Sequence, residues 1–212
     1  MDGPILYMAK SHDAGATWSL PEVINQTNPA YGPHYGGSGR TQGYELQRGP
    51  HKGRLVVPKI GATTAEQAAK PDPWRQMHAM VMYSDDQGKT WTMGQETGGV
   101  HTQWDECTLT EMHNGSVLLS PRVDDPYDAD PKHPDPNATR RLTTRGFARS
   151  DDGGATFAEV WTVYERQPEI YDSACSDGLV YSPKTGKMYW GKPYGINGTR
   201  TNYTLMQSSD QA

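Results

Sequence analysis

Ser84-Asp-Asp86-Gln-Gly88-Lys-Thr90-Trp91 is the stretch of this sequence that decides its fold. The same pattern of Ser, Asp, Gly, Thr and an aromatic residue returns at residues 11–18 and 150–157, and a further copy begins at Ser208. The four copies start 73, 66 and 58 residues apart. This spacing is typical of one four-stranded antiparallel sheet per repeat, which indicates the blades of a β-propeller.

The residues of this repeat, here called the Asp box, predict a rigid hairpin turn. We expect Asp13, Asp86 and Asp152 to accept backbone N–H bonds, and the glycine of each box to adopt a positive φ. The aromatic residue at the end of the box then closes the turn over the sheet. We therefore assign the three aspartates a structural role and not a catalytic one.

Thirteen segments between and around the boxes have the pattern of β-strands. They are residues 5–9, 18–24, 43–47, 54–60, 78–83, 91–96, 107–112, 116–121, 141–149, 157–163, 174–182, 187–192 and 201–207. If the strands of a blade are lettered A to D from the axis outward, every box lies in the turn from C to D. The order is then C-D, A-B-C-D, A-B-C-D, A-B-C.

This order predicts an all-β fold of about three blades, with one partial propeller domain over residues 1–212 and an incomplete ring. An incomplete ring leaves sheet edges unpaired. We therefore expect the chain to be the central part of a longer protein, and to be unstable or to aggregate when isolated.

The composition excludes several classes of function. The formal net charge is −5 and the pI is about 5.8, with no local basic patch, so no nucleic-acid partner is expected. No apolar run approaches the ~18 residues that a membrane span needs. The two cysteines, Cys107 and Cys175, have no Cys or His at metal-ligand spacing, so neither a metal nor another cofactor is expected. They form either a disulfide near the axis or two buried apolar side chains.

Five of the six asparagines stand in Asn-x-Ser/Thr sequons, which favours a secreted or lysosomal protein. For Asn114 and Asn197, a plain Asn-Gly turn is the alternative. No signal peptide is visible, so the protein is alternatively cytoplasmic, or its true beginning is missing. We expect a solvated loop at residues 124–137, with calcium binding as a minor alternative, and a short helical turn within residues 63–73.

Three charged residues are expected on one rim of the propeller. In an antiparallel blade, the start of A, the end of B and the start of C share a rim, opposite the Asp boxes. Glu106 precedes a strand A, Arg122 follows a strand B, and Arg200 precedes a strand C. Two guanidinium groups and a carboxylate at one mouth predict a pocket for an anionic ligand. The alternative is that Glu106 pairs with an arginine as a purely structural contact.

Two further segments, together with the boxes, resemble a known family. They are Gly36-Gly-Ser-Gly-Arg-Thr-Gln-Gly43, which continues to Pro58, and Asp105-Glu106-Cys-Thr-Leu-Thr-Glu, which continues to Arg122. In these segments the sequence is similar to the exo-α-sialidases (neuraminidases) of the bacterial and animal lysosomal type. The resemblance runs over essentially the whole chain. It implies a six-bladed propeller that hydrolyses terminal sialic acids with retention, in oligosaccharide and ganglioside catabolism.

The resemblance also implies roles for the rim residues. Glu106 looks like the carboxylate that takes a proton from a nucleophilic tyrosine, a known exception to the paired-carboxylate mechanism of glycosidases. Arg122 and Arg200 look like two of three arginines that bind the carboxylate of sialic acid. The first arginine, the general acid and the tyrosine have no matching segment, so we expect the chain alone to be nearly inactive.

Other residues on the same rim are expected to line the substrate, namely Tyr35, Arg40, Tyr171 and Asp172. Neither Tyr171 nor Asp172 occupies the position of the family's nucleophile or acid. The expected partners are sialylated oligosaccharides, glycoproteins or glycolipids. The alternative function is that of a non-catalytic Asp-box propeller that binds glycans or proteins.

Overall fold

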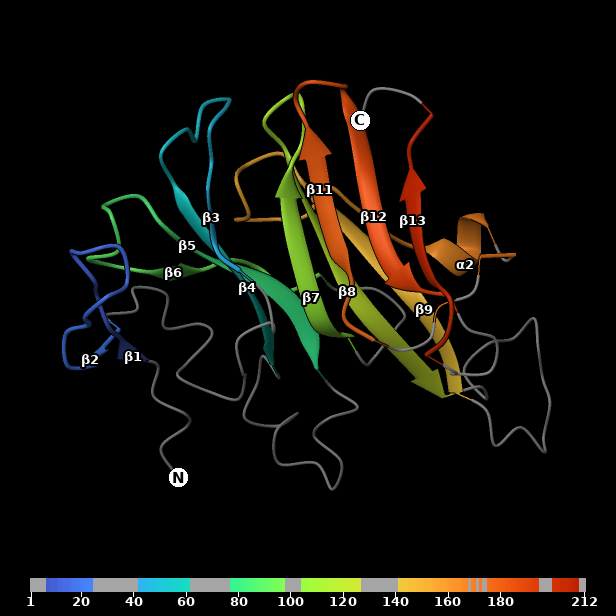
Figure 1. Ribbon diagram of the computed structural model, residues 1–212, viewed down its shortest axis with the longest axis horizontal. Helices are drawn as coiled ribbons and strands as arrows, with labels where there is room; N and C mark the ends of the chain where they lie inside the picture. Colours follow the sequence, from blue (N-terminus) through green and yellow to red (C-terminus); the bar gives the residue numbers. More distant parts are fainter. Residues whose placement is uncertain are drawn as a thin grey trace.

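The computed structural model describes residues 7–24, 42–61, 77–97, 104–126, 141–167, 169–170, 172, 175–194 and 200–209. Within these ranges the chain forms thirteen strands and one helix, α2, at Val163–Arg166. The strands make four antiparallel sheets in the orders β1-β2, β3-β4-β5-β6, β10-β9-β8-β7 and β11-β12-β13 (Figure 1).

The strand bounds place one complete box in each of the first three sheets, in the turn before its last strand, and the fourth copy begins after the last strand. The first two sheets are β1 (Tyr7–Met8) and β2 (Glu22–Val23), then β3 (Tyr44–Glu45), β4 (Leu55–Gly61), β5 (His78–Ser84) and β6 (Thr92–Met93). The last two are β7 (Trp104–Glu111), β8 (Val117–Pro126), β9 (Arg141–Ser150) and β10 (Glu159–Thr162), then β11 (Gly178–Ser182), β12 (Lys187–Pro193) and β13 (Tyr203–Gln207).

The expected order of strands is confirmed, because each of the thirteen segments overlaps one strand and the sheets have two, four, four and three strands. The boundaries differ at the rim. Glu106 and Arg122 were expected just outside their strands, but they lie inside β7 and β8. The ladder reaches this far because Asp105 pairs with Arg122 across the two strands, and Arg122 pairs with Arg145 on β9.

The Asp boxes have the geometry that their residues predict. The Oδ1 atom of Asp86 accepts the backbone N–H of Thr90 at 2.8 Å, and its Oδ2 accepts the Thr90 hydroxyl at 2.6 Å. Gly88 has a φ of 82°, and the indole of Trp91 donates to its carbonyl at 3.2 Å. The same Asp-to-Thr bonds occur in the boxes of Asp13 and Asp152.

The core lies between neighbouring sheets. The largest buried cluster joins β4 and β5 to β7, β8 and β9, and includes Val56, Val81, Trp104 and Leu119. A second cluster, around Phe147 and Trp190, joins the sheet of β7–β10 to that of β11–β13. The two four-stranded sheets therefore bury both faces of their central strands against neighbouring sheets, as blades do.

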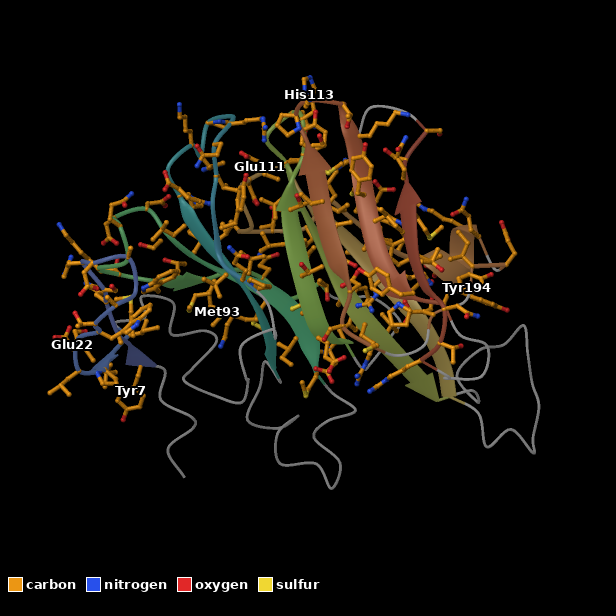
Figure 2. The ribbon with its side chains drawn as sticks, in the orientation of Figure 1. Tyr7, Glu22, Met93, Glu111, His113 and Tyr194 are labelled. Carbon is orange, nitrogen blue, oxygen red and sulfur yellow. The ribbon has the colours of Figure 1, made fainter. Side chains whose placement is uncertain are left out.

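Two buried charged groups also connect neighbouring blades. The fully buried Glu111 accepts backbone N–H bonds from Gln47 and Arg48, and pairs with the Arg48 guanidinium at 3.0 Å. Arg54 binds Asp85 through two bonds of 2.8 Å and donates to the carbonyls of Asp152 and Gly153 in the next blade. These contacts lie at the box side of the propeller, and Figure 2 shows Glu111 at the upper end of the sheets.

The cysteines, one expected loop and the single helix differ from the sequence predictions or settle an open alternative. Both cysteines are free in the structure, and Cys107 is buried, which raises the pKa of its thiol to about 12. Strand β8 continues through residues 124–126, where a loop was expected, and residues 127–137 and 63–73 lie outside the described residues. Helix α2 was not predicted, and its first residue, Val163, was expected to be the last residue of the strand 157–163. No helix in the described ranges has the length and apolar character to cross a membrane.

Candidate active site

The candidate site lies at the rim where β7 starts, β8 ends and β9 starts. These three strand ends meet at the lower edge of the sheets in Figure 1. Asp105 on β7, Arg122 on β8 and Arg145 on β9 are direct partners in the strand register. One row across the sheet thus carries a carboxylate and two guanidinium groups.

Glu106 occupies a β-bulge in this row. Between the pairs Asp105–Arg122 and Thr108–Ser120, β7 has two residues where β8 has one, Pro121. Proline has no N–H to donate to the ladder, and bulges are among the few places where a sheet accepts it. Glu106 takes a φ of 28°, in the left-handed region that non-glycine residues rarely adopt. The bulge re-aims the Glu106 side chain toward β8.

Arg122 binds both acidic residues at the start of β7. Its Nη1 donates to Oε2 of Glu106 at 2.8 Å, and its Nη2 donates to Oδ2 of Asp105 at 2.9 Å. The side chains of Arg122 and Glu106 are 14% and 7% exposed. Charge-assisted bonds of this length, with little solvent to screen them, form a strong contact. Glu106 and Arg122 therefore lie together on the rim, and their direct ion pair is also the contact that the structural alternative predicts.

Arg145 lies beneath this pair and is fully buried. Its Nη1 donates to the Glu106 carbonyl oxygen at 3.4 Å, and its Nη2 donates to the Cys175 carbonyl. The guanidinium is also paired with Asp172 and Asp177, each at 3.4 Å. Arg145 therefore links the main chain at Glu106 to the segment that leads into β11.

The aspartates beside Arg145 have a buried environment of their own. Oδ2 of Asp177 accepts the Ser120 hydroxyl and the Trp190 indole N–H, both at 2.8 Å. Burial raises the pKa of Asp177, although Arg145 and these two bonds oppose the rise. Lys192, fully buried at 3.8 Å from Asp172, has its pKa lowered by burial. Two cations and two carboxylates thus share one region of low dielectric.

The other expected site residues have different positions. Asp172 was expected to line the substrate, and the structure buries it against Arg145 and Lys192. Arg200 is exposed, just before β13, on the rim where the sequence places it. Tyr35, Arg40 and Tyr171 lie outside the described residues.

Sequence reasoning missed four charged residues of this region: Asp105, Arg145, Asp177 and Lys192. Asp105 precedes Glu106 in a segment whose importance was clear, so its role was open to prediction. Arg145 is an arginine in the middle of a strand whose neighbours are buried, which is a signal, since such a charge needs a partner. Its partners lie 27 and more residues away along the chain, and no local pattern connects them.

A separate cavity of about 700 Å³ lies between the blades of β7–β10 and β11–β13. Its lining is mainly apolar and aromatic, with Phe147, Trp161, Trp190 and Met206 among its residues. Arg166 is the one charged residue of this lining. The cavity therefore has none of the acid and base groups that the rim combines. No cluster of metal-ligating side chains occurs in the part of the chain that the structure describes.

Known proteins with similar sequences show which family this chain resembles. Residues 82–93 match the BNR/Asp-box repeat family. The chain is 33% identical to a sialidase of Micromonospora viridifaciens over 155 residues, which are 72% of this chain and 20% of that protein. It is 32% identical to a sialidase of Bacteroides fragilis (strain YCH46) over 176 residues, 82% of this chain and 26% of that protein. The chain is a relative of the sialidases.

Solved structures agree with this relationship at the level of the fold. The leech intramolecular trans-sialidase, solved with 2,7-anhydro-Neu5Ac, has a TM-score of 0.65 and 21% sequence identity over 95% of this chain and 25% of that one. The fold of this sialidase relative is therefore that of the sialidase β-propellers, with an incomplete ring. The chain spans about a fifth to a quarter of the length of the curated sialidases that it matches.

Proposed function

We propose that the rim of β7, β8 and β9 is part of the active site of an exo-α-sialidase. Its reaction is the hydrolysis of terminal α-linked sialic acids from glycoproteins, glycolipids or oligosaccharides, with retention at the anomeric carbon. The observation that carries this proposal is the 2.8 Å contact between Glu106 and Arg122 at a β-bulge on the rim. The relationship to sialidases supports the choice of substrate.

Arg122 binds the carboxylate that distinguishes sialic acids from most sugars. A guanidinium presents a planar fork of N–H groups that matches a carboxylate. In the structure this fork is directed at Asp105 and Glu106. Substrate binding therefore draws the Arg122 N–H groups toward the sugar and loosens their hold on Glu106. The Glu106 carboxylate is then available to accept a proton.

The base acts on a tyrosine in this proposal. Glu106 takes the phenolic proton while the tyrosine oxygen attacks the anomeric carbon, and a general acid protonates the departing aglycone oxygen. The deprotonated general acid then takes a proton from a water molecule as the water oxygen attacks the glycosyl-tyrosine, and Glu106 returns the phenolic proton to the departing tyrosine oxygen. A neutral nucleophile suits an anionic substrate, which a carboxylate nucleophile would repel. The acid and the tyrosine lie outside the segments that carry the resemblance.

Further residues complete the proposed substrate site. Arg200 adds a second guanidinium for the sialic acid carboxylate, and Tyr35, Arg40 and Tyr171 line the sugar. Asp172 supports the site indirectly, because it is buried and paired with Arg145 and Lys192. The sequons support a secreted or lysosomal protein that degrades sialylated oligosaccharides and gangliosides.

The test is release of 4-methylumbelliferone from its α-N-acetylneuraminic acid glycoside. We expect the 212-residue chain alone to bind 2-deoxy-2,3-didehydro-N-acetylneuraminic acid but to release no fluorophore. A longer polypeptide that adds an acid and a tyrosine releases it, and Glu106→Gln lowers its kcat by at least about 100-fold, since a general base contributes that much. Glu159→Gln, the same change at an exposed carboxylate on β10, is the control and leaves kcat unchanged.

Two results would contradict the proposal. Full turnover by the Glu106→Gln variant would remove Glu106 from the mechanism. Binding of sialylated glycans without turnover by the longer polypeptide would favour the non-catalytic propeller instead.

A further inference from the structure

We propose that Arg145 is a positioning residue that holds Glu106 in its catalytic orientation through the main chain. This inference rests on the proposed function, because it deepens the account of the same site. The side chain of Arg145 has no exposed surface, so it acts on the reaction through Glu106 and not by contact with substrate.

The first step of the argument is the conformation of Glu106. A non-glycine residue with a φ of 28° is strained, and such strain persists where surrounding contacts over-determine the backbone. The Glu106 N–H donates to its neighbour Asp105 at 2.7 Å, and the Glu106 carbonyl accepts from Arg145 at 3.4 Å. The peptide groups on both sides of the strained residue are therefore held by charged side chains.

The second step is the shape of the guanidinium group. One arginine reaches the Glu106 carbonyl, the Cys175 carbonyl and the Asp172 carboxylate from three different nitrogens. The nitrogens of a guanidinium are fixed in one plane, so these three acceptors are fixed relative to one another. A lysine ammonium at the same place offers one nitrogen and cannot span them.

The third step is electrostatic. Arg145 and Arg122 are direct neighbours on adjacent strands, and like charges in such a pair repel. Asp172 and Asp177 neutralise Arg145 from the side of β11, whereas Asp105 and Glu106 neutralise Arg122 from β7. This division leaves the Glu106 carboxylate directed at Arg122, where the proposed substrate binds. Asp172 and Asp177 are therefore paired with Arg145, and Asp105 and Glu106 with Arg122.

The first experiment measures the backbone of Glu106 directly, by NMR chemical shifts of its Cα and Cβ in the 212-residue chain. We expect both Arg145→Lys and the charge-balanced double variant Arg145→Met/Asp177→Asn to shift these signals toward extended values. The control is Arg54→Met, which removes another buried arginine that donates to two backbone carbonyls, at the opposite rim. It leaves the Glu106 signals in place even though it lowers the Tm.

Unchanged Glu106 signals in either folded Arg145 variant would overturn the proposal. If the double variant does not fold, Arg145→Lys decides the question, because it keeps the buried positive charge. This readout needs no catalytic activity, so it stands whether or not the chain is part of a sialidase.

The second experiment separates kcat from KM in the polypeptide that cleaves the fluorogenic sialoside. We expect Arg145→Lys to lower kcat by about 100-fold, the usual effect of a misplaced catalytic group, with KM within about twofold because Arg122 still binds the carboxylate. Equal kcat values for Arg145→Lys and wild type would overturn the positioning role. Absence of cleavage by the wild type would instead contradict the proposed function.

Discussion

At the scale of single residues, the three box aspartates show how a side chain replaces a backbone partner. Each accepts an N–H and a hydroxyl from the threonine four residues on. Hydrogen bonds to a carboxylate favour its charged form. Those from Thr90 are the main cause of the low pKa of Asp86, about 2. For Asp152, burial alone would raise the pKa, but the bonds from Thr156 and Ser150 outweigh it and the pKa is lowered.

The first prediction concerns acid stability. Because the folded pKa of Asp86 is below its ordinary value, the unfolded state binds more protons, and the stability from this group is present above about pH 4 and lost toward pH 2. Thr90→Val removes the hydroxyl donor and should raise this pKa, so that stability is lost at a higher pH. The measurement is an NMR titration of the Asp86 carboxyl carbon. Thr17→Val is the control, since it should move Asp13 and leave Asp86 unchanged.

Some residues of the candidate site could be predicted from the sequence and others could not. Glu106 and Arg122 were predictable because the boxes define the places of β7 and β8 in a blade, and therefore the rim on which the two residues lie. Arg145 and Asp177 were not, because their pairing depends on the register of β8 with β9 and on the packing of two blades. The carboxylate that the sequence placed at the surface, Asp172, is buried for the same reason.

At the scale of elements, neighbouring blades meet backbone to backbone at Gly94. Its N–H donates to the Val81 carbonyl at 2.8 Å within its own sheet, and the next residue, Gln95, donates to the Ala155 carbonyl of the following box at 2.8 Å. A Cβ at Gly94 would lie 2.2 Å from the Gly154 carbonyl oxygen. The box turn of one blade is therefore seated on the last strand of the blade before it.

The second prediction follows from this contact. Gly94→Ala forces the two backbones apart and should lower the free energy of unfolding by about 1–3 kcal/mol, the usual cost of overpacking. The measurement is urea denaturation. Gly178→Ala on β11 is the matched control, because no atom lies within 4 Å of its added methyl group. Equal stability of the two variants would mean that the blades are not in contact there.

Strands were easier to predict than their ends or the single helix. The boxes fix where strand C stops, and alternation fixes the strands between them, so all thirteen were found. Helix α2 directly follows β10, the last strand of its blade. It begins there because Thr162 and Glu165 form a capping box, in which each side chain bonds the other residue's backbone N–H. This T-x-x-E signal was in the sequence, but it followed an apolar strand pattern that hid it.

At the scale of the whole molecule, the first and last sheets each expose large apolar side chains. On the last sheet these include Tyr203, Leu205 and Val180, at 75%, 67% and 56% exposure, and on the first sheet Val23 and Tyr7 are 61% and 58% exposed. Blades normally bury such faces against a neighbour. Exposed apolar patches with unpaired strand edges favour association.

The third prediction is therefore self-association of the 212-residue chain, detected as an apparent mass that rises with concentration in sedimentation or light scattering. Leu205→Lys should weaken this association because it places a charge on the exposed face of β13. Gln207→Lys adds the same charge to the same strand without removing apolar surface, and should have a smaller effect. A strictly monomeric wild-type chain at all concentrations would contradict the expectation.

The guanidinium of Arg54 couples the local unfolding of two neighbouring boxes. It is held by Asp85 in its own blade's box, and it donates to two carbonyls inside the box that follows. If the second box opens, Asp85 releases the Arg54 guanidinium, which is the donor to the carbonyls of Asp152 and Gly153 in the third box. Amide exchange in the second and third boxes should accordingly proceed in a single cooperative event, unlike that of an array whose repeats fray one at a time.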